Sequence, residues 1–128
     1  MRKEDRLDFG RGVYIIISVL LIILVFAGID YFVHSLNEAD WGVPGYYFTN
    51  KIIYGIIWGL VAYFLIRRWK AVKKIRSLIF SVVVAAILQI RYAYEGYSMS
   101  FVLLFLVLHF LILWPVSYLI FRFMKERI

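Results

Sequence analysis

The sequence predicts an all-α integral membrane protein: a four-transmembrane-helix bundle with both termini in the cytoplasm. Three observations predict it. Four long apolar runs fill the chain, 64% of its residues are hydrophobic with a mean hydropathy of +0.84, and the basic residues gather at one kind of end of the runs. A soluble domain of 128 residues cannot bury that much apolar surface. We therefore expect a multi-pass protein of the cell membrane, surrounded by the lipid bilayer.

The first, second and fourth apolar runs are each long enough for one transmembrane helix, and the third, from Leu78 to Ile90, needs Ser77 and residues 91–94 to complete its span. A helix needs about 20 residues to cross a hydrocarbon core of ~30 Å. The runs are continuous rather than alternating, which favours helices over the strands of a barrel. No linker or repeat divides the chain, so we expect one domain over residues 1–128. The predicted spans are approximately residues 13–33, 47–66, 77–94 and 101–121.

The distribution of charge predicts the orientation of the bundle. Thirteen of the 15 basic residues lie before the first span, between the second and third, and after the fourth. The positive-inside rule places residues 1–12, 67–76 and 122–128 in the cytoplasm. The middle segment is also a candidate for binding anionic lipid headgroups. Its basic residues are Arg67, Arg68, Lys70, Lys73, Lys74 and Arg76.

Composition excludes several classes of function. The chain has no cysteine, which excludes disulfides, thiol chemistry and cysteine metal sites. Its net charge of +7 follows mostly from the topology, and no soluble domain offers a groove for nucleic acid. No nucleophile motif, phosphate-binding loop or pair of catalytic carboxylates is present. No cofactor is strongly implied, and a non-enzymatic protein is the favoured interpretation.

Small residues mark the helix faces that we expect to contact protein rather than lipid. Gly55 and Gly59 form a G-x-x-x-G pair in the second span, and Ser77, Ser81 and Ala85 repeat every four residues in the third. Small side chains let two helix backbones approach closely within lipid. Both stripes are therefore predicted to lie at helix–helix contacts.

Five polar residues lie on or near these faces, all in the predicted outer half of the membrane. Asp30 and His34 are one helical turn apart in the first span. Lys51 continues the glycine stripe, Gln89 continues the serine–alanine stripe, and His109 lies about two turns inside the fourth span. Polar and ionisable residues at such depth usually face the bundle interior and often serve function. We expect the five to form a polar cluster for a ligand or proton.

Structural interpretations of the same residues stay open. Asp30 and Lys51 form an ion pair that ties two helices together under this alternative, and Gln89 is an interhelical hydrogen-bond donor. His109 then bonds to a neighbouring carbonyl or tyrosine. Arg91 and Glu95, four residues apart, are expected to pair near the membrane interface.

A sharper hypothesis makes Asp30, His34 and His109 metal ligands. Imidazole and carboxylate suit zinc or another transition ion, and a spacing of four residues puts two ligands on one side of a helix. Glu38 or Glu95 would complete the site. A related hypothesis is a proton or ion relay through the polar cluster.

Tyrosines gather toward the predicted outer side of the membrane. Amphipathic aromatic rings are favoured at the membrane interface, so the pattern predicts an anchoring girdle. It is not typical of a ligand cage. The residues concerned are Tyr31, Tyr46, Tyr47, Tyr54, Tyr92, Tyr94 and Tyr97.

Three functions remain after the sequence has been considered. The leading expectation is a non-enzymatic protein that acts by forming homo-oligomers or as a subunit of a larger membrane complex. It depends on the small-residue faces, the minimal loops and the absence of catalytic motifs. The alternative is a self-contained protein that transports or binds a proton, ion or small solute through the polar cluster. A membrane-embedded metal-dependent enzyme is third.

Overall fold

The computed structural model describes residues 3–68 and 73–124, with side chains described for 9–66 and 75–124, and these residues form helices joined by short links. Four of the helices are long and apolar enough to cross a membrane, which confirms the predicted class of four-helix membrane bundle. The elements are α1 (Lys3–Ser35), α2 (Glu38–Trp41), α3 (Gly45–Arg68), α4 (Lys73–Tyr94) and α5 (Met99–Phe123).

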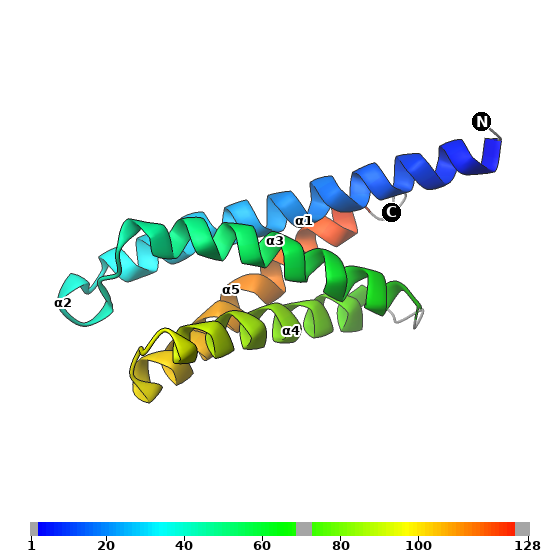
Figure 1. The fold of residues 1–128 in the computed structure, drawn as a ribbon. Coiled ribbons are helices and arrows are strands. Elements are labelled where there is room, and N and C mark those ends of the chain that lie inside the picture. The colour runs from blue at the N-terminus through cyan, green and yellow to red at the C-terminus, as the bar shows by residue number, and fades with distance from the viewer. Residues whose placement is uncertain (1–2, 69–72, 125–128) are drawn as a thin grey trace.

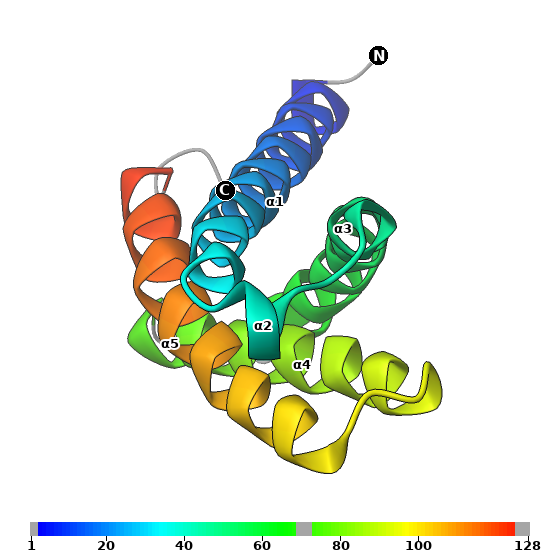
Figure 2. The same ribbon diagram turned by 90° about the vertical axis from the view of Figure 1, so that its left-hand side faces the viewer.

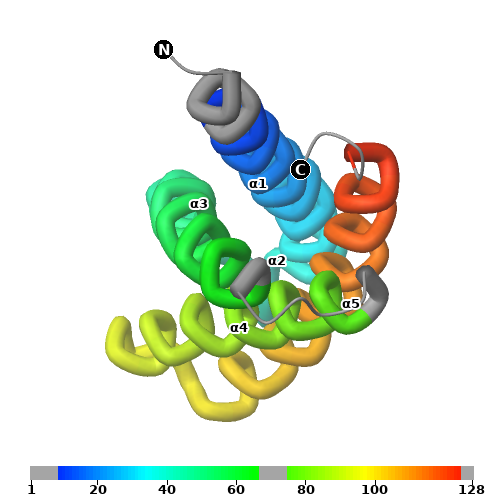
Figure 3. Tube along the Cα trace, turned by 90° about the vertical axis from the view of Figure 1, so that its right-hand side faces the viewer, coloured from blue at the N-terminus to red at the C-terminus, as the bar shows by residue number. Residues whose placement is uncertain are grey.

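The four long helices form a closed ring. Each contacts two others, in the order α1, α3, α4, α5 and back to α1. The short links make chain neighbours antiparallel, so α2 and the α4–α5 turn lie at one end, which we call the α2 end (Figure 1). Figure 2, seen from that end, shows α1 and α3 on one side of the bundle and α4 and α5 on the other. Figure 3 shows the opposite end, where α1 begins.

The short helix α2 was not predicted from the sequence, although its signals are present. The Asn37 side chain accepts a hydrogen bond from the backbone N–H of Asp40, as an N-cap residue does. Two acidic residues follow in the first turn, where the helix dipole favours negative charge. The helix ends at Trp41, and α3 begins directly after Pro44. The connection between α1 and α3 is therefore a compact cap at the end of the bundle.

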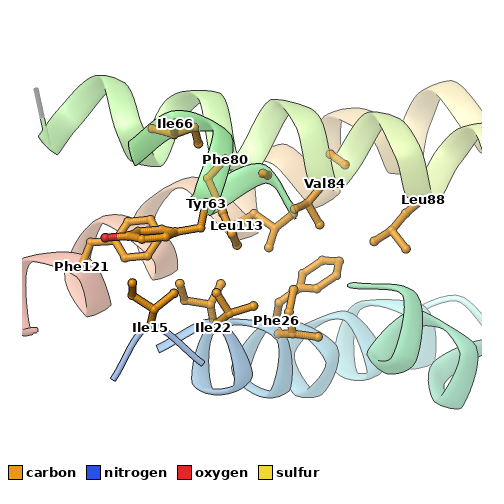
Figure 4. Close-up of a cluster of buried hydrophobic side chains, with 14 of the residues drawn as sticks. Ile15, Ile22, Phe26, Tyr63, Ile66, Phe80, Val84, Leu88, Leu113 and Phe121 are labelled. Carbon is orange, nitrogen blue, oxygen red and sulfur yellow. The ribbon is translucent and has the colours of Figure 1, made fainter. Parts of the chain in front are cut away.

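Apolar side chains from all four long helices fill the middle of the bundle. Figure 4 shows that they point into the space that the helices enclose. Their burial supplies the packing that positions the polar groups nearer the α2 end. The labelled side chains are Ile15, Ile22 and Phe26 of α1, Tyr63 and Ile66 of α3, Phe80, Val84 and Leu88 of α4, and Leu113 and Phe121 of α5.

The small-residue stripes lie at contacts between helices of the same chain. A Cβ atom at Gly59 would lie 2.9 Å from Val19 Cγ1 of α1 and 3.3 Å from Phe80 of α4. A Cβ at Gly55 would lie 3.1 Å from Ile23 of α1. On α4, Ser81 is buried and its Oγ lies 3.2 Å from Ser117 Oγ of α5. The close approaches that these residues permit thus build the bundle itself.

The outward faces of the long helices carry large apolar side chains. Leu24, Phe64, Ile90 and Leu111, one on each long helix, are each about half exposed. Such a surface is stable in hydrocarbon and would associate in water, which agrees with a multi-pass membrane protein. Most of the predicted headgroup-binding segment lies outside the described side chains: Arg67, Arg68, Lys70, Lys73 and Lys74. Arg76 of that set is half-buried, and its lipid contact stays a prediction.

Replacing Gly59 by leucine should destabilise the bundle, because the new side chain would meet Val19 and Phe80. We expect a loss of about 1–3 kcal/mol in the free energy of unfolding, the usual cost of overpacking. The matched control is Gly28→Leu, because nothing lies within 4 Å of a Cβ at Gly28. Thermal unfolding of both variants in detergent measures the difference. Equal melting temperatures for the two would contradict the packing described here.

The predicted orientation can be tested with single cysteines, because the chain has none of its own. Val72→Cys lies in the basic segment that we expect in the cytoplasm, and Ala39→Cys lies exposed on α2 at the opposite end. A membrane-impermeant thiol reagent added outside intact cells should modify only the cysteine at position 39. Modification of the cysteine at position 72 under these conditions would reverse the orientation.

Candidate functional site

The structure brings all five sequence-predicted polar residues together inside the α2 end of the bundle. Asp30 and His34 come from α1, and the other three come one each from α3, α4 and α5. Each residue is at most 3% exposed. Since each of the long helices contributes, the cluster forms only when the whole bundle is assembled. The polar cluster consists of Asp30, His34, Lys51, Gln89 and His109.

The carboxylate of Asp30 lies at the centre of the polar cluster. Its Oδ1 lies 3.1 Å from His109 Nε2. Its Oδ2 accepts a hydrogen bond from Lys51 Nζ and lies 3.3 Å from His34 Nε2. A buried carboxylate is costly unless it is paired and hydrogen-bonded. Asp30 is stabilised by Lys51 of α3 and His109 of α5, which both lie far from it in the sequence.

His109 connects α5 to the other three helices. Its Nε2 contacts both Asp30 Oδ1 and Lys51 Nζ, the latter at 3.0 Å, while its Nδ1 lies 2.5 Å from Gln89 Nε2. Nε2 carries a proton when it donates to Asp30 and a lone pair when it accepts from the Lys51 ammonium. One neutral ring cannot do both, so the tautomer of His109 depends on whether Nε2 donates to Asp30 or accepts from Lys51.

His34 is the residue through which the polar cluster contacts the cap. Its Nδ1 lies 2.7 Å from the backbone carbonyl oxygen of Trp41. A carbonyl only accepts, so Nδ1 carries the donated proton. In the neutral ring, Nε2 therefore presents a lone pair toward Asp30. That lone pair and the carboxylate repel each other. The Lys51 ammonium, which is bound to the same carboxylate, offsets this repulsion.

Aromatic rings surround the Lys51 ammonium. Nζ lies 4.1 Å from the ring centroid of Tyr47 and 5.4–5.5 Å from those of Phe26 and Tyr92. Such distances allow cation–π attraction, which strengthens when the cation is out of water. The Lys51 ammonium therefore contacts a carboxylate on one side and aromatic rings on the other sides, as a bound cation would.

Two tyrosines depart from the predicted anchoring role. Tyr47 and Tyr92 are each 1% exposed, and their rings stack with centroids 4.5 Å apart beside Lys51. The expectation of an interfacial girdle was wrong for these two, because they lie on the same inward faces as Lys51 and Gln89. Their positions relate to these residues: Tyr47 precedes Lys51 by one turn, and Tyr92 follows Gln89 by three residues. This spacing is the signal that could have identified them.

A surface pocket of about 510 Å³ leads to His34 from the α2 end. His34 contributes to its lining, together with Glu38 of α2 and Phe48 of α3. In the other direction along α1, Phe26 packs edge-on against the His109 ring, and the apolar core follows. The polar cluster therefore lies nearest to the surface on the α2 side.

Three of the five residues meet the geometric requirement for a metal site. One ligand atom from each of Asp30, His34 and His109 can be chosen so that all lie within 4.8 Å of one another. Imidazole and carboxylate are ligands that zinc accepts. The Lys51 ammonium shares Asp30 and His109 with them, so a metal ion and the ammonium would compete for the same atoms.

Neither additional ligand suggested by the sequence joins this set. Glu95 lies outside the polar cluster, where its Oε1 is 3.2 Å from Arg91 Nε, and both side chains are partly exposed. This is the interfacial pair that the spacing of four residues predicts. Glu38 is exposed on α2, in the lining of the surface pocket. The proposal that either completes a metal site was wrong, because the cap and the α4–α5 turn hold them at the rim.

Comparisons with protein-family models, curated protein sequences and solved structures give no match for this chain. The fold and the site define a four-helix membrane bundle with a buried polar cluster at its α2 end.

A double-mutant cycle separates the Asp30–Lys51 ion pair from the rest of the site. Asp30→Asn and Lys51→Met should each lower the free energy of unfolding by about 3–5 kcal/mol, because each leaves an uncompensated buried charge. The double mutant should regain part of that loss, since no charge is then left unpaired. Unfolding of the four proteins in detergent measures the coupling. Strictly additive effects would show that the two charges do not interact.

Proposed function

We propose that this chain is a self-contained membrane protein that binds a small cation at the polar cluster, with access from the α2 side. The observation that carries the proposal is the environment of Asp30. One buried carboxylate faces two histidine Nε2 atoms and an ammonium, and these come from three helices. Ionisable groups so deep in a membrane bundle commonly mark an ion pathway or binding site.

The contacts of Lys51 within the polar cluster support a cation as the ligand. Lys51 Nζ contacts a carboxylate oxygen, an imidazole nitrogen and the face of Tyr47. These are the groups that recognise a positively charged ligand. Lys51 thus acts as a tethered cation, and an incoming cation binds by taking its place beside Asp30. Binding and the position of the ammonium are then coupled, because both need the same oxygen.

The route to the site supports uptake from one side. The surface pocket at the α2 end reaches His34. The exposed carboxylate of Glu38 adds negative potential at the rim of this pocket. Phe26 and the apolar core lie beyond His109. A binding site at the end of a short access pocket fits this arrangement better than an open pore does.

Assembly with itself or with other membrane subunits stays a prediction, but its main argument is weaker. The small-residue stripes that favoured it are used inside one chain, where Gly55 and Gly59 pack against Ile23, Val19 and Phe80. The proton relay and the metal-dependent enzyme that the sequence suggested also stay predictions. The polar cluster has no comparable explanation in packing alone, because apolar side chains would fill the same space at lower cost.

Cation binding should raise the melting temperature of the protein purified in detergent. A ligand that binds only the folded state stabilises it by ~2.7 kcal/mol at about 100 times its Kd. The assay compares chloride salts of K⁺, NH₄⁺, Ca²⁺ and Zn²⁺ at matched ionic strength. We expect at least one to stabilise the wild type. Asp30→Asn and His109→Ala should remove the effect.

The matched control for this assay is Asp40→Asn, the same substitution at an exposed carboxylate of α2. It should keep the wild-type response. Stabilisation by no cation would contradict the proposal, and so would a response that survives in Asp30→Asn.

A further inference from the structure

We infer that the cation is a divalent transition-metal ion of the zinc class, bound by Asp30 and by the Nε2 atoms of His34 and His109. The inference rests on the proposed cation-binding function and names its ligand class. It depends on three observations: the separation of the ligand atoms, the groups that hold each imidazole from behind, and the position of Lys51.

The separations between ligand atoms are close to those that a tetrahedral ion requires. Zn–N and Zn–O bonds of ~2.0–2.2 Å place neighbouring tetrahedral ligands about 3.3–3.6 Å apart. Each histidine Nε2 lies 3.1–3.3 Å from an oxygen of Asp30. The whole set fits within 4.8 Å, so small side-chain rotations close the remaining gap. All three side chains are buried, which keeps competing water away from the ligand atoms.

Both imidazoles are oriented in the way that metal-binding histidines are. Such a histidine binds the metal through one ring nitrogen and is held at the other by a carbonyl, carboxylate or water. His34 Nδ1 is held by the carbonyl of Trp41. His109 Nδ1 is held by the amide of Gln89, whose Oε1 has no hydrogen-bond partner in the orientation observed. With that amide turned over, Oε1 accepts the Nδ1 proton, and Nε2 is left with a lone pair.

The chemistry of these ligands selects among cations. Two neutral nitrogens and one carboxylate suit zinc and its neighbours in the transition series. Calcium and magnesium require a shell of six or more oxygens, and one carboxylate supplies too few. The three ligands also match the number that a zinc ion has at sites where a fourth position stays open.

Lys51 occupies the place that the metal ion needs. Its ammonium binds Asp30 Oδ2 and lies 3.0 Å from His109 Nε2, so it uses two of the three ligands. A divalent ion beside the same carboxylate would be repelled by the ammonium. Binding therefore requires Lys51 Nζ to leave, and an uncharged side chain of similar length at this position should favour the metal.

Zinc binding to the wild-type protein in detergent can be measured by titration calorimetry. Lys51→Met should bind zinc about tenfold more tightly than the wild type. Gln89→Leu should bind ~10–100-fold more weakly, because it removes the group that orients His109. His34→Gln and His109→Gln should lose at least as much, and Asp40→Asn should match the wild type. If Lys51→Met binds no more tightly, or if both histidine variants bind normally, the inference is overturned.

A measurement on the wild type tests the inference even if the variants fail to fold. The chain has two histidines and no cysteine, so any imidazole bound to zinc belongs to the polar cluster, provided that the purification tag has no histidine. X-ray absorption at the zinc edge should show nitrogen or oxygen ligands at ~2.0–2.2 Å with scattering from two imidazoles. Absence of the imidazole signal would overturn the inference.

The outcomes also separate this inference from the proposed function. If zinc does not bind to the wild type or to Lys51→Met, but K⁺ or NH₄⁺ stabilises the protein through Asp30, the metal class is wrong and cation binding stands. If none of the cations acts through Asp30, both are wrong.

Discussion

The structure depends on one constraint: the carboxylate of Asp30 lies inside a membrane bundle and must be compensated there. Leaving water costs an ion several kcal/mol even after relaxation, and hydrocarbon offers no substitute. The compensation comes from Lys51 of α3 and His109 of α5, which contact the two oxygens of the carboxylate. Gln89 of α4 then holds His109. The same charge that makes the site costly therefore fixes how the α2 end of the four helices must meet.

The apolar packing makes that meeting possible. Gly55 lies one turn beyond Lys51 on α3 and brings its backbone close to Ile23 of α1. The helices are then near enough for the Lys51 side chain to reach Asp30 without extending toward the membrane surface. Phe26 and Tyr47 close the space around the ammonium and exclude water. Packing and electrostatics are thus coupled, because a bulkier residue on the glycine stripe would separate the two charges as well as the two helices.

The sequence was sufficient to predict the four long helices and the five residues of the polar cluster. Length, hydropathy and small-residue stripes are local signals, and a polar residue that continues an inward stripe must point inward too. The contact between His34 and the cap could not be predicted in this way. The carbonyl of Trp41 that holds His34 is a backbone group, so no residue type marks it. Tyr47 and Tyr92 were misinterpreted because a tyrosine near a span end suits both the membrane interface and the interior. Glu38 and Glu95 were considered as ligands because composition cannot distinguish a rim position from a buried one.

The central claim is that one carboxylate joins both histidines of this chain in a single buried site. Nitrogen NMR of protein labelled only at its histidine rings tests it directly, since the spectrum contains two imidazoles. The account predicts that Asp30→Asn shifts the Nε2 signals of both His34 and His109, while Asp40→Asn shifts neither. His34 is the one-turn neighbour of Asp30 on the same helix, so its response alone would not require the fold described. An unchanged His109 signal in Asp30→Asn would contradict the account, because α5 would then not bring its histidine to the carboxylate.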